Sequence, residues 1–491
     1  MLTVQQRINT GIVWMVAARL MDRGIGVLST LILARLLIPA DFGLVAMATA
    51  IGGILDLLGA FSFELALIQN KTADKAHYDT VWTFNALFGL FCAAALVALA
   101  IPASAFYHEP RLEAVMYALS CTYVVGGFSN VGVVNFRKEL AFRDEFNFIF
   151  LKRVITFFVT VGCAYELRSY WALVAGMVVG RVASVYLSYK MSNYRPRLTL
   201  SARNELFHFS KWLFINNILF FLLHSGPNFI VGRINGALGL GIYTVSYEIS
   251  NLPSTELVAP INRVTFPGFS KMGSTEVMAA SYLKLLGMIT LLILPVGMGI
   301  AALAEPIVWV TLGANWRPAI PLIQLLGIYG AIAATQTNNS VVWMVLGRTK
   351  DIAVNTILFL AVFFPALYFF LTEADILGVG YAYLLAQVIS MPTGLWNTKT
   401  LLGLSWNKMG GAVWRPIIAS ALMYEAVSLL DEHLSNLGVV LRLCSGSLFG
   451  FLVYSFVILT LWFLARKPAG AESFCLERSR NALISMTRNL Q

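Results

Sequence analysis

The chain has 491 residues, of which 58% are hydrophobic and 12% are charged, and its mean hydropathy is +0.74. Soluble proteins carry about 25% charged residues, so this composition excludes an ordinary soluble enzyme and predicts an integral membrane protein. The net charge of +10 would suggest a nucleic-acid partner in a soluble chain. Its placement along this sequence fits a membrane protein better, and we expect no nucleic-acid ligand.

The apolar residues gather in long stretches. A helix needs about 20 apolar residues to cross about 30 Å of hydrocarbon. Fourteen stretches meet this requirement, which predicts an all-α integral membrane protein with about 14 transmembrane helices. They are residues 12–35, 43–66, 79–101, 113–135, 146–165, 169–190, 210–232, 238–260, 280–303, 319–346, 352–371, 376–398, 412–430 and 438–464.

Lys and Arg are distributed unevenly between the two sides of the predicted membrane. With the N-terminus inside, 26 of them fall on inner loops, tails and helix ends, including Lys152 and Arg153, and 6 fall outside. Arg19, Arg23 and Arg181 lie within the spans. Because Lys and Arg concentrate in cytoplasmic loops, we expect an even number of spans with both termini in the cytoplasm.

An internal repeat relates the two halves of the chain. A shift of 198 residues pairs five identities: Trp14 with Trp212, Ile32 with Ile230, Arg35 with Arg233, Gly43 with Gly241, and Ile51 with Ile249. In both copies a Trp stands near a helix start, an Arg at its end and a Gly at the opening of the next helix. We interpret this as a duplication of six spans, which places a pseudo-two-fold axis along the membrane normal and a cleft between the copies.

The repeat predicts four regions. Residues 1–205 form an N-lobe of helices 1–6, and residues 206–405 form a C-lobe of helices 7–12. Residues 406–465 add helices 13 and 14, and residues 466–491 form a basic cytoplasmic tail. The polar stretch 191–209 is interpreted as the linker between the lobes.

Three charges interrupt the first span. Spacings of three and four residues place Arg19, Asp22 and Arg23 on one helix face. Each charge at the bilayer centre costs about 2.5–3.5 kcal/mol, so this face should line a wet cavity. One interpretation is a self-neutralising patch that locks the helix to a neighbour. The other is a net-positive site for an anionic headgroup, because the planar guanidinium can bond two phosphate oxygens at once.

Further charges fall in the second and sixth spans. Asp56 and Glu64 are eight residues apart on the second helix and are candidate partners of the arginines on the first. Arg181 stands beside a ladder of small residues, which we expect to serve helix packing. Its side chain either faces the cavity or extends to the inner interface.

The segment 243–271 is unusual for a spanning helix. Its prolines recur every seven residues, at Pro253, Pro260 and Pro267. Glu248 and Glu256 lie in the same segment. A broken helix that carries acids suits the binding of a proton or Na⁺ during transport. A kinked structural helix with its glutamates near the interface is the alternative.

Other classes of site lack their motifs. The five cysteines contain no C-x-x-C pair, so neither a zinc site nor a disulfide framework is predicted. The sequence has no G-x-x-x-x-G-K-[ST] motif, so we expect no bound nucleotide, and no cofactor or metal is predicted. No predicted outer loop exceeds about 15 residues, which leaves no room for an external catalytic domain.

The chain resembles bacterial polysaccharide flippases of the Wzx/PST type, in the MOP (multidrug/oligosaccharidyl-lipid/polysaccharide) superfamily, and within them the colanic-acid-exporter-like branch. The resemblance rests on LARLLIPADFGL (33–44), FRKELAFR (136–143), YTVSYEISNLPSTELVAPINRVTFPGFSKM (243–272) and GANWRPAIPLIQLL (313–326). It covers nearly the whole chain, and its third motif is the most specific.

The resemblance implies a function without catalysis. It implies two six-helix lobes plus two C-terminal helices in the bacterial inner membrane, and the flipping of an undecaprenyl-diphosphate-linked oligosaccharide to the periplasmic leaflet without ATP hydrolysis. Intramembrane arginines would hold the anionic headgroup, a role that we carry onto Arg19, Arg23, Arg181 and Arg263. Membrane lipids, a coupling H⁺ or Na⁺, and polysaccharide polymerase or export machinery are the implied partners. Asp22, Asp56, Glu64, Glu248 and Glu256 are the candidates for ion coupling or cavity polarity.

Three rival interpretations stay open. A multidrug antiporter of the same superfamily would need an apolar, aromatic cavity with an essential acid. A membrane-embedded polysaccharide polymerase or ligase would need a large external loop. A structural scaffold would not need arginines inside a span.

Overall fold

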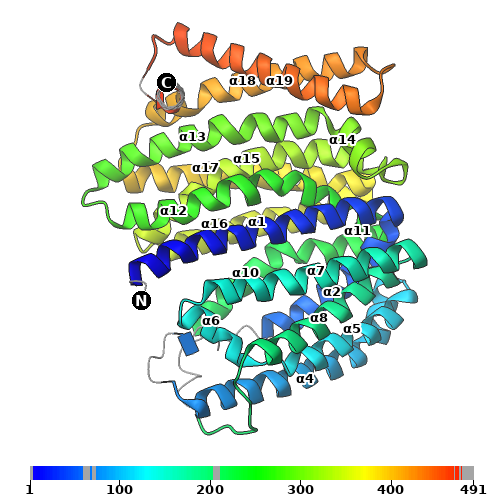
Figure 1. The fold of residues 1–491 in the computed structure, drawn as a ribbon. Helices are drawn as coiled ribbons and strands as arrows, with labels where there is room; N and C mark the ends of the chain where they lie inside the picture. The colour runs from blue at the N-terminus through cyan, green and yellow to red at the C-terminus, as the bar shows by residue number, and fades with distance from the viewer. Residues whose placement is uncertain are drawn as a thin grey trace, which may run out of the picture. The chain divides into compact units, whose positions relative to one another are not determined.

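The structure is a computed structural model, and it describes residues 4–58, 67–68, 73–202, 211–468, 470–474 and 477. The described residues are α-helical and contain no strand (Figure 1). The helices are α1 (Val4–Leu36), α2 (Pro39–Leu58), α4 (Lys75–Tyr107), α5 (Arg111–Gly127), α6 (Asn135–Lys138), α7 (Phe142–Leu167), α8 (Trp171–Met191), α10 (Lys211–His224), α11 (Gly226–Pro253), α12 (Ala259–Ser270), α13 (Thr275–Ala302), α14 (Ala304–Thr311), α15 (Ala319–Val345), α16 (Thr349–Ala374), α17 (Gly378–Leu402), α18 (Trp406–His433) and α19 (Val439–Leu464).

Within the described residues, ten helical segments are long and apolar enough to cross a membrane. The number is 11 if α5 and the short helices after it, bent by 68°, form one span. Two of the ten segments, Asn217–Ser270 and Thr349–Leu402, are 54 residues long. The first covers most of the predicted stretch 210–232 and all of 238–260, and the second contains both 352–371 and 376–398. Helix α1, which carries Arg7, Arg19, Asp22, Arg23 and Arg35, is not among the ten. The fold is therefore the predicted multi-pass helical membrane protein, and it is compatible with fourteen spans.

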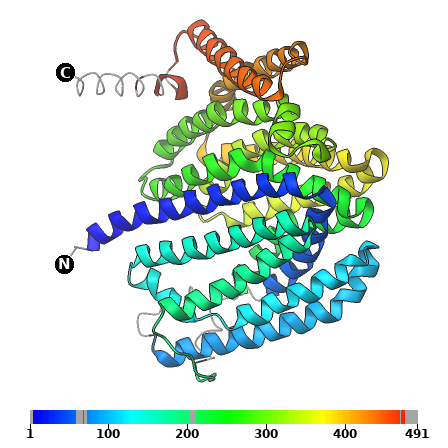
Figure 2. The same ribbon diagram turned by 45° about the vertical axis from the view of Figure 1, so that its right-hand side comes forward.

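The chain divides into two compact units, Met1–Thr244 (unit 1) and Val245–Gln491 (unit 2). In unit 1, α7 packs against α1 and α8, and α5 packs against α4 and α8, as Figures 1 and 2 show. In unit 2, α13 packs against α15 and α18, α17 packs against α15 and α16, and α18 packs against α19. The predicted lobe boundaries follow the repeat rather than these contacts, and they stay predictions.

Helix α11 consists of two helices joined at Gly236. Gly236 has φ 65° and ψ −166°, a conformation that glycine adopts without steric cost. The 198-residue shift pairs Gly236 with Ile38, which lies in the turn between α1 and α2. The two copies of the repeat therefore turn at equivalent positions.

These two turns contact each other inside unit 1. A Cβ atom on Gly43 would collide with the Ala237 carbonyl, and one on Gly241 would collide with the Pro39 carbonyl. The shift that pairs Gly43 with Gly241 also pairs Pro39 with Ala237. The contact is thus reciprocal, as expected where two equivalent segments meet at a two-fold axis. This geometry supports the predicted pseudo-two-fold relation.

The start of the predicted linker is fastened to α4. The Asp79 carboxylate accepts hydrogen bonds from the Tyr194 hydroxyl and, at 3.0 Å, from the Arg197 backbone N–H. Thr83 Oγ1 accepts a bond of 3.1 Å from the Thr199 backbone N–H. Burial and the hydrogen bond to Asp79 raise the pKa of Tyr194, so its hydroxyl stays a donor. Residues 203–210 lie outside the described part of the chain.

The proline-rich segment is irregular, as its sequence predicts. Helix α11 ends at Pro253, and a π-helical turn, Ser254–Val258, leads into α12. Proline has no N–H to donate and disturbs the regular hydrogen-bond ladder, so a change of helical pitch is expected next to it. The predicted break therefore takes the form of a wider turn in a continuous helix.

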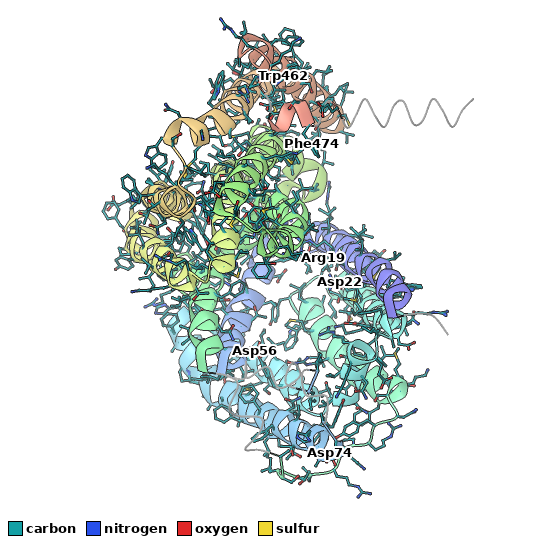
Figure 3. The ribbon with its side chains drawn as sticks, turned by 90° about the vertical axis from the view of Figure 1, so that its left-hand side faces the viewer. Arg19, Asp22, Asp56, Asp74, Trp462 and Phe474 are labelled. Carbon is teal, nitrogen blue, oxygen red and sulfur yellow. The ribbon has the colours of Figure 1, made fainter. Side chains whose placement is uncertain are left out.

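The predicted tail begins with an anchored segment in unit 2. Arg415 on α18 and Glu472 form two hydrogen bonds of 2.7 and 3.2 Å, and only 7% and 6% of their side chains are exposed. Trp462 Nε1, on the helix that leads into this segment, donates to the Pro468 carbonyl at 3.1 Å (Figure 3). The first residues of the tail are therefore packed against the helices.

We predict that Gly43→Ala destabilises the protein by about 1–3 kcal/mol, because the added Cβ atom must displace backbone on the facing helix. Thermal unfolding of the purified protein in detergent, followed by tryptophan fluorescence, measures the effect. Gly24→Ala is the matched control, since a Cβ atom there meets no heavy atom within 4 Å. Equal unfolding midpoints for the two variants would contradict the close contact.

Candidate functional site

A cavity of about 510 Å³ lies within unit 1, and helices α1, α2, α4, α5, α7 and α8 contribute to its wall. Five charged residues line it: Asp22, Asp56, Lys152, Arg153 and Arg181. The hydroxyl groups of its wall come from Thr49, Thr122, Tyr123, Thr156 and Ser184. The cavity is therefore polar although apolar helices form it.

Three cations enter the cavity from two neighbouring helices. Lys152 and Arg153 come from α7, and Arg181 comes from α8. Arg181 Nε donates a long hydrogen bond of 3.4 Å to the Thr122 carbonyl on α5. Its guanidinium packs over Gly126, where any Cβ atom would collide with it. Because Gly126 has no side chain, the Arg181 guanidinium can lie against its backbone.

Two carboxylates face these cations from other helices. Asp22 Oδ1 on α1 lies 3.3 Å from Arg153 Nε. The Asp56 carboxylate on α2 lies within hydrogen-bonding reach of the Tyr123 hydroxyl and within range of the Arg181 charge. Figure 3 labels Asp22 and Asp56, which belong to different walls of the cavity.

Close packing of α7 on α8 brings the three cations together. A Cβ atom on Gly176 or Gly180 would collide with the hydroxyl of Thr160 or Thr156, respectively, on α7. Small residues allow such close approach of helix backbones within a membrane. The small-residue ladder beside Arg181 therefore serves helix packing, as predicted.

The structure brings three of the predicted site residues into this cavity: Asp22, Asp56 and Arg181. Arg19 lies three residues before Asp22 on α1, and Arg23 directly follows Asp22. Both arginines are half-buried without being part of the cavity wall. Their predicted role as headgroup ligands stays a prediction.

The remaining predicted residues lie elsewhere. Glu248 on α11 and Glu256 in the π-helical turn are half-buried within unit 2. Arg263 lies on α12, but its side chain is outside the described part of the structure, and Glu64 is outside the described residues altogether. Their proposed functions are not tested by the geometry.

Sequence reasoning missed Lys152 and Arg153 as site residues. It assigned them to an inner helix end, because they stand near the start of the predicted stretch 146–165. The helix in fact begins at Phe142, and Lys152 lies ten residues further along it. The available signal was two adjacent cations inside the apolar run FIFLKRVITFF (148–158), which should be read as intramembrane charge.

The wall of the cavity has an excess of positive charge. Three cations face two carboxylates, and several hydroxyl groups can donate further hydrogen bonds. Among the described residues, no group of His, Cys, Asp and Glu side chains could hold a metal ion. The arrangement suits a ligand with anionic oxygens, such as a phosphate or an acidic sugar.

Comparison with solved structures defines the class of fold. A lipid II flippase, MurJ, in an inward closed conformation matches with a TM-score of 0.67 and 12% sequence identity, over 92% of this chain and 99% of the other. An inward-facing MATE-family multidrug resistance transporter of the MOP superfamily matches with a TM-score of 0.56 and 16% identity, over 78% and 96%. The chain therefore shares its fold with these two transporters.

The sequence defines the family within this fold. The profile of the polysaccharide biosynthesis protein family matches residues 32–321, and the chain belongs to this family. WzxC, a lipopolysaccharide biosynthesis protein of Escherichia coli (strain K12), is 25% identical over 85% of this chain and 86% of its own length. ExoT, a succinoglycan biosynthesis transport protein of Rhizobium meliloti (strain 1021), is 24% identical over 91% of both chains. TuaB, a teichuronic acid biosynthesis protein of Bacillus subtilis (strain 168), is 21% identical over 81% and 83%. The predicted resemblance is confirmed.

We predict that Ser184→Cys, in a variant without the five native cysteines, reacts with a membrane-impermeant methanethiosulfonate at least about tenfold faster than Ala183→Cys. Ser184 lines the cavity, whereas Ala183 is 8% exposed and lies outside its wall. Only a thiolate in contact with water reacts readily. Mass spectrometry of the labelled protein measures both rates. Equally slow labelling at both positions would show that water does not reach the cavity.

Proposed function

We propose that this protein moves an undecaprenyl-diphosphate-linked oligosaccharide from the cytoplasmic to the periplasmic leaflet, and that the cavity of unit 1 holds its diphosphate. The observation that carries the proposal is the group of three cations, Lys152, Arg153 and Arg181, inside a helical membrane unit. Family membership and the names of the relatives, which include a polysaccharide transport protein, support the same function. The oligosaccharide that is moved would be the repeat unit of an exopolysaccharide, a capsule or a lipopolysaccharide.

The chemistry of the cations fits a diphosphate. A guanidinium is planar and can form two parallel hydrogen bonds with phosphate oxygens, whereas the lysine ammonium acts as a point charge. Arg153 and Arg181 would supply the directional contacts and Lys152 additional charge. We retain Arg19, Arg23 and Arg263 as further headgroup ligands in other steps of the transport cycle.

Transport would proceed by alternating access. The polyprenyl chain would stay in the lipid while the polar headgroup passes through the protein as the two halves of the repeat change their arrangement. The π-helical turn at Ser254–Val258 offers a place where a helix can bend.

The membrane potential favours export. With the inside negative, outward movement of each negative charge gains about 2.3 kcal/mol per 100 mV. A diphosphate with about two charges would then gain about 4.6 kcal/mol per 100 mV if no cation accompanied it. Entry of H⁺ or Na⁺ on Asp56, Glu248 or Glu256 would add to this drive or reset the carrier.

The charge of the cavity disfavours the rival interpretations. A multidrug antiporter that exports organic cations would place its cargo beside three positive side chains, which costs electrostatic energy. A polymerase or ligase would need catalytic residues on a large external loop, and the described connections between helices are short. We therefore propose a transporter without enzymatic activity, located in the inner membrane with both termini in the cytoplasm, which delivers its substrate to polymerase or export machinery.

We predict that Arg153→Ala and Arg181→Ala each slow flipping by about 10–100-fold, because a hydrogen bond to a charged group contributes about 1.5–3 kcal/mol. The rate is measured in proteoliposomes that contain a fluorescent undecaprenyl-diphosphate oligosaccharide. As the substrate crosses the bilayer, a membrane-impermeant reagent loses the ability to quench its fluorescence. Arg143→Ala is the matched control, since Arg143 is an exposed arginine on α7, the helix of Arg153, and does not line the cavity.

Three outcomes would separate the possibilities. Wild-type flipping rates for both cavity variants would show that the anion site lies elsewhere in the protein, and the proposed function would still stand. Loss of flipping in Arg19→Ala/Arg23→Ala alone would transfer the site to α1. If the wild type flips no lipid but exchanges organic cations for protons, the multidrug interpretation replaces ours.

A further inference from the structure

The two carboxylates of the cavity differ in how they meet the cations. Asp56 lies near the Tyr123 hydroxyl and the Arg181 charge. Asp22 makes one contact with the guanidinium of Arg153, at 3.3 Å, and it also lies within range of the Lys152 charge. Asp22 thus interacts with both cations that α7 contributes.

The Asp22–Arg153 contact is looser than other ion pairs of the same chain. Arg415 and Glu472 form two hydrogen bonds of 2.7 and 3.2 Å, with 7% and 6% of their side chains exposed. In the cavity, Arg153 and Asp22 are 33% and 51% exposed. Arg153 Nε is itself buried, yet it has no hydrogen-bond partner among the described residues. A guanidinium with an unsatisfied buried nitrogen gains from a better-placed acceptor.

Helix α1 holds the guanidinium close to Asp22. A Cβ atom on Gly26, one turn after Asp22, would lie 2.5 Å from Arg153 Nη2. The guanidinium therefore lies against the α1 backbone, with Asp22 beside it on the cavity wall. Asp22 and Arg153 both line the cavity, so an anion that enters it can meet both side chains.

We propose that Asp22 is an internal competitor for the anion site. Its carboxylate occupies Arg153 when no headgroup is bound, and a phosphate group, which offers more oxygens to the guanidinium fork, displaces it. When the two halves of the repeat rearrange, Asp22 returns to Arg153 and helps to release the phosphate. Asp22 is thus a positioning residue that limits how tightly the headgroup is held. This inference rests on the proposed anion site of unit 1.

Binding of inorganic pyrophosphate to the purified full-length protein in detergent tests the proposal by isothermal titration calorimetry. Asp22→Asn should bind pyrophosphate about 5–50-fold more tightly than the wild type, and Asp22→Glu should restore wild-type affinity. In the flipping assay, Asp22→Asn should lower the rate at saturating substrate, because release of the headgroup becomes slower. Asp144→Asn, an exposed carboxylate on α7, is the control and should change neither quantity.

A double-mutant cycle separates competition at Arg153 from a general gain of positive charge. If Asp22 acts through Arg153, the tighter binding should vanish in the Arg153→Ala background. Equal gains in both backgrounds, or no gain in either, would overturn the proposal. Absence of pyrophosphate binding in both the wild type and Asp22→Asn would overturn the anion site as well. If flipping depends on Arg153 while Asp22→Asn binds no more tightly, the proposed function stands and the competitor role falls.

Discussion

The cost of placing charge in hydrocarbon governs the organisation of unit 1. Each charged side chain at the bilayer centre costs about 2.5–3.5 kcal/mol unless water or a counter-charge receives it. Five charged side chains from α1, α2, α7 and α8 line one polar cavity instead of facing lipid. Glycines at positions 26, 126, 176 and 180 leave the room that these side chains and their helices need. Apolar helices thus form the wall of the cavity, and the few charged side chains determine which ligands the cavity can bind.

The two copies of the duplication share a backbone turn, but the charged side chains of the first copy are absent from the second. The turns at Ile38 and Gly236 are equivalent, and the glycines next to them contact each other reciprocally. The charges of α1 have no such counterparts, since the 198-residue shift places Asn217, Phe220 and Phe221 at the positions of Arg19, Asp22 and Arg23. A symmetric frame that carries an asymmetric set of charges suits a carrier whose substrate has one anionic end.

The sequence predicts features that depend on local composition. Apolar stretches predicted the helices, the prolines predicted the irregular turn after α11, and single intramembrane charges identified Asp22, Asp56 and Arg181. Features that depend on tertiary packing could not be predicted from the sequence. Asp22 contacts Arg153 on α7 although two arginines stand within one turn of it on its own helix. Lys152 and Arg153 resembled an interfacial pair because the true start of their helix lies before the apolar run.

Direct observation of the bound headgroup tests the central claim, which is that the cavity of unit 1 is the anion site. The measurement is a cryo-electron microscopy structure of the protein in lipid nanodiscs with an undecaprenyl-diphosphate oligosaccharide. We expect density for the diphosphate between Arg153 and Arg181, with the Asp22 side chain turned away from Arg153. Density for the diphosphate at residues of unit 2, with the cavity of unit 1 unchanged, would contradict this assignment.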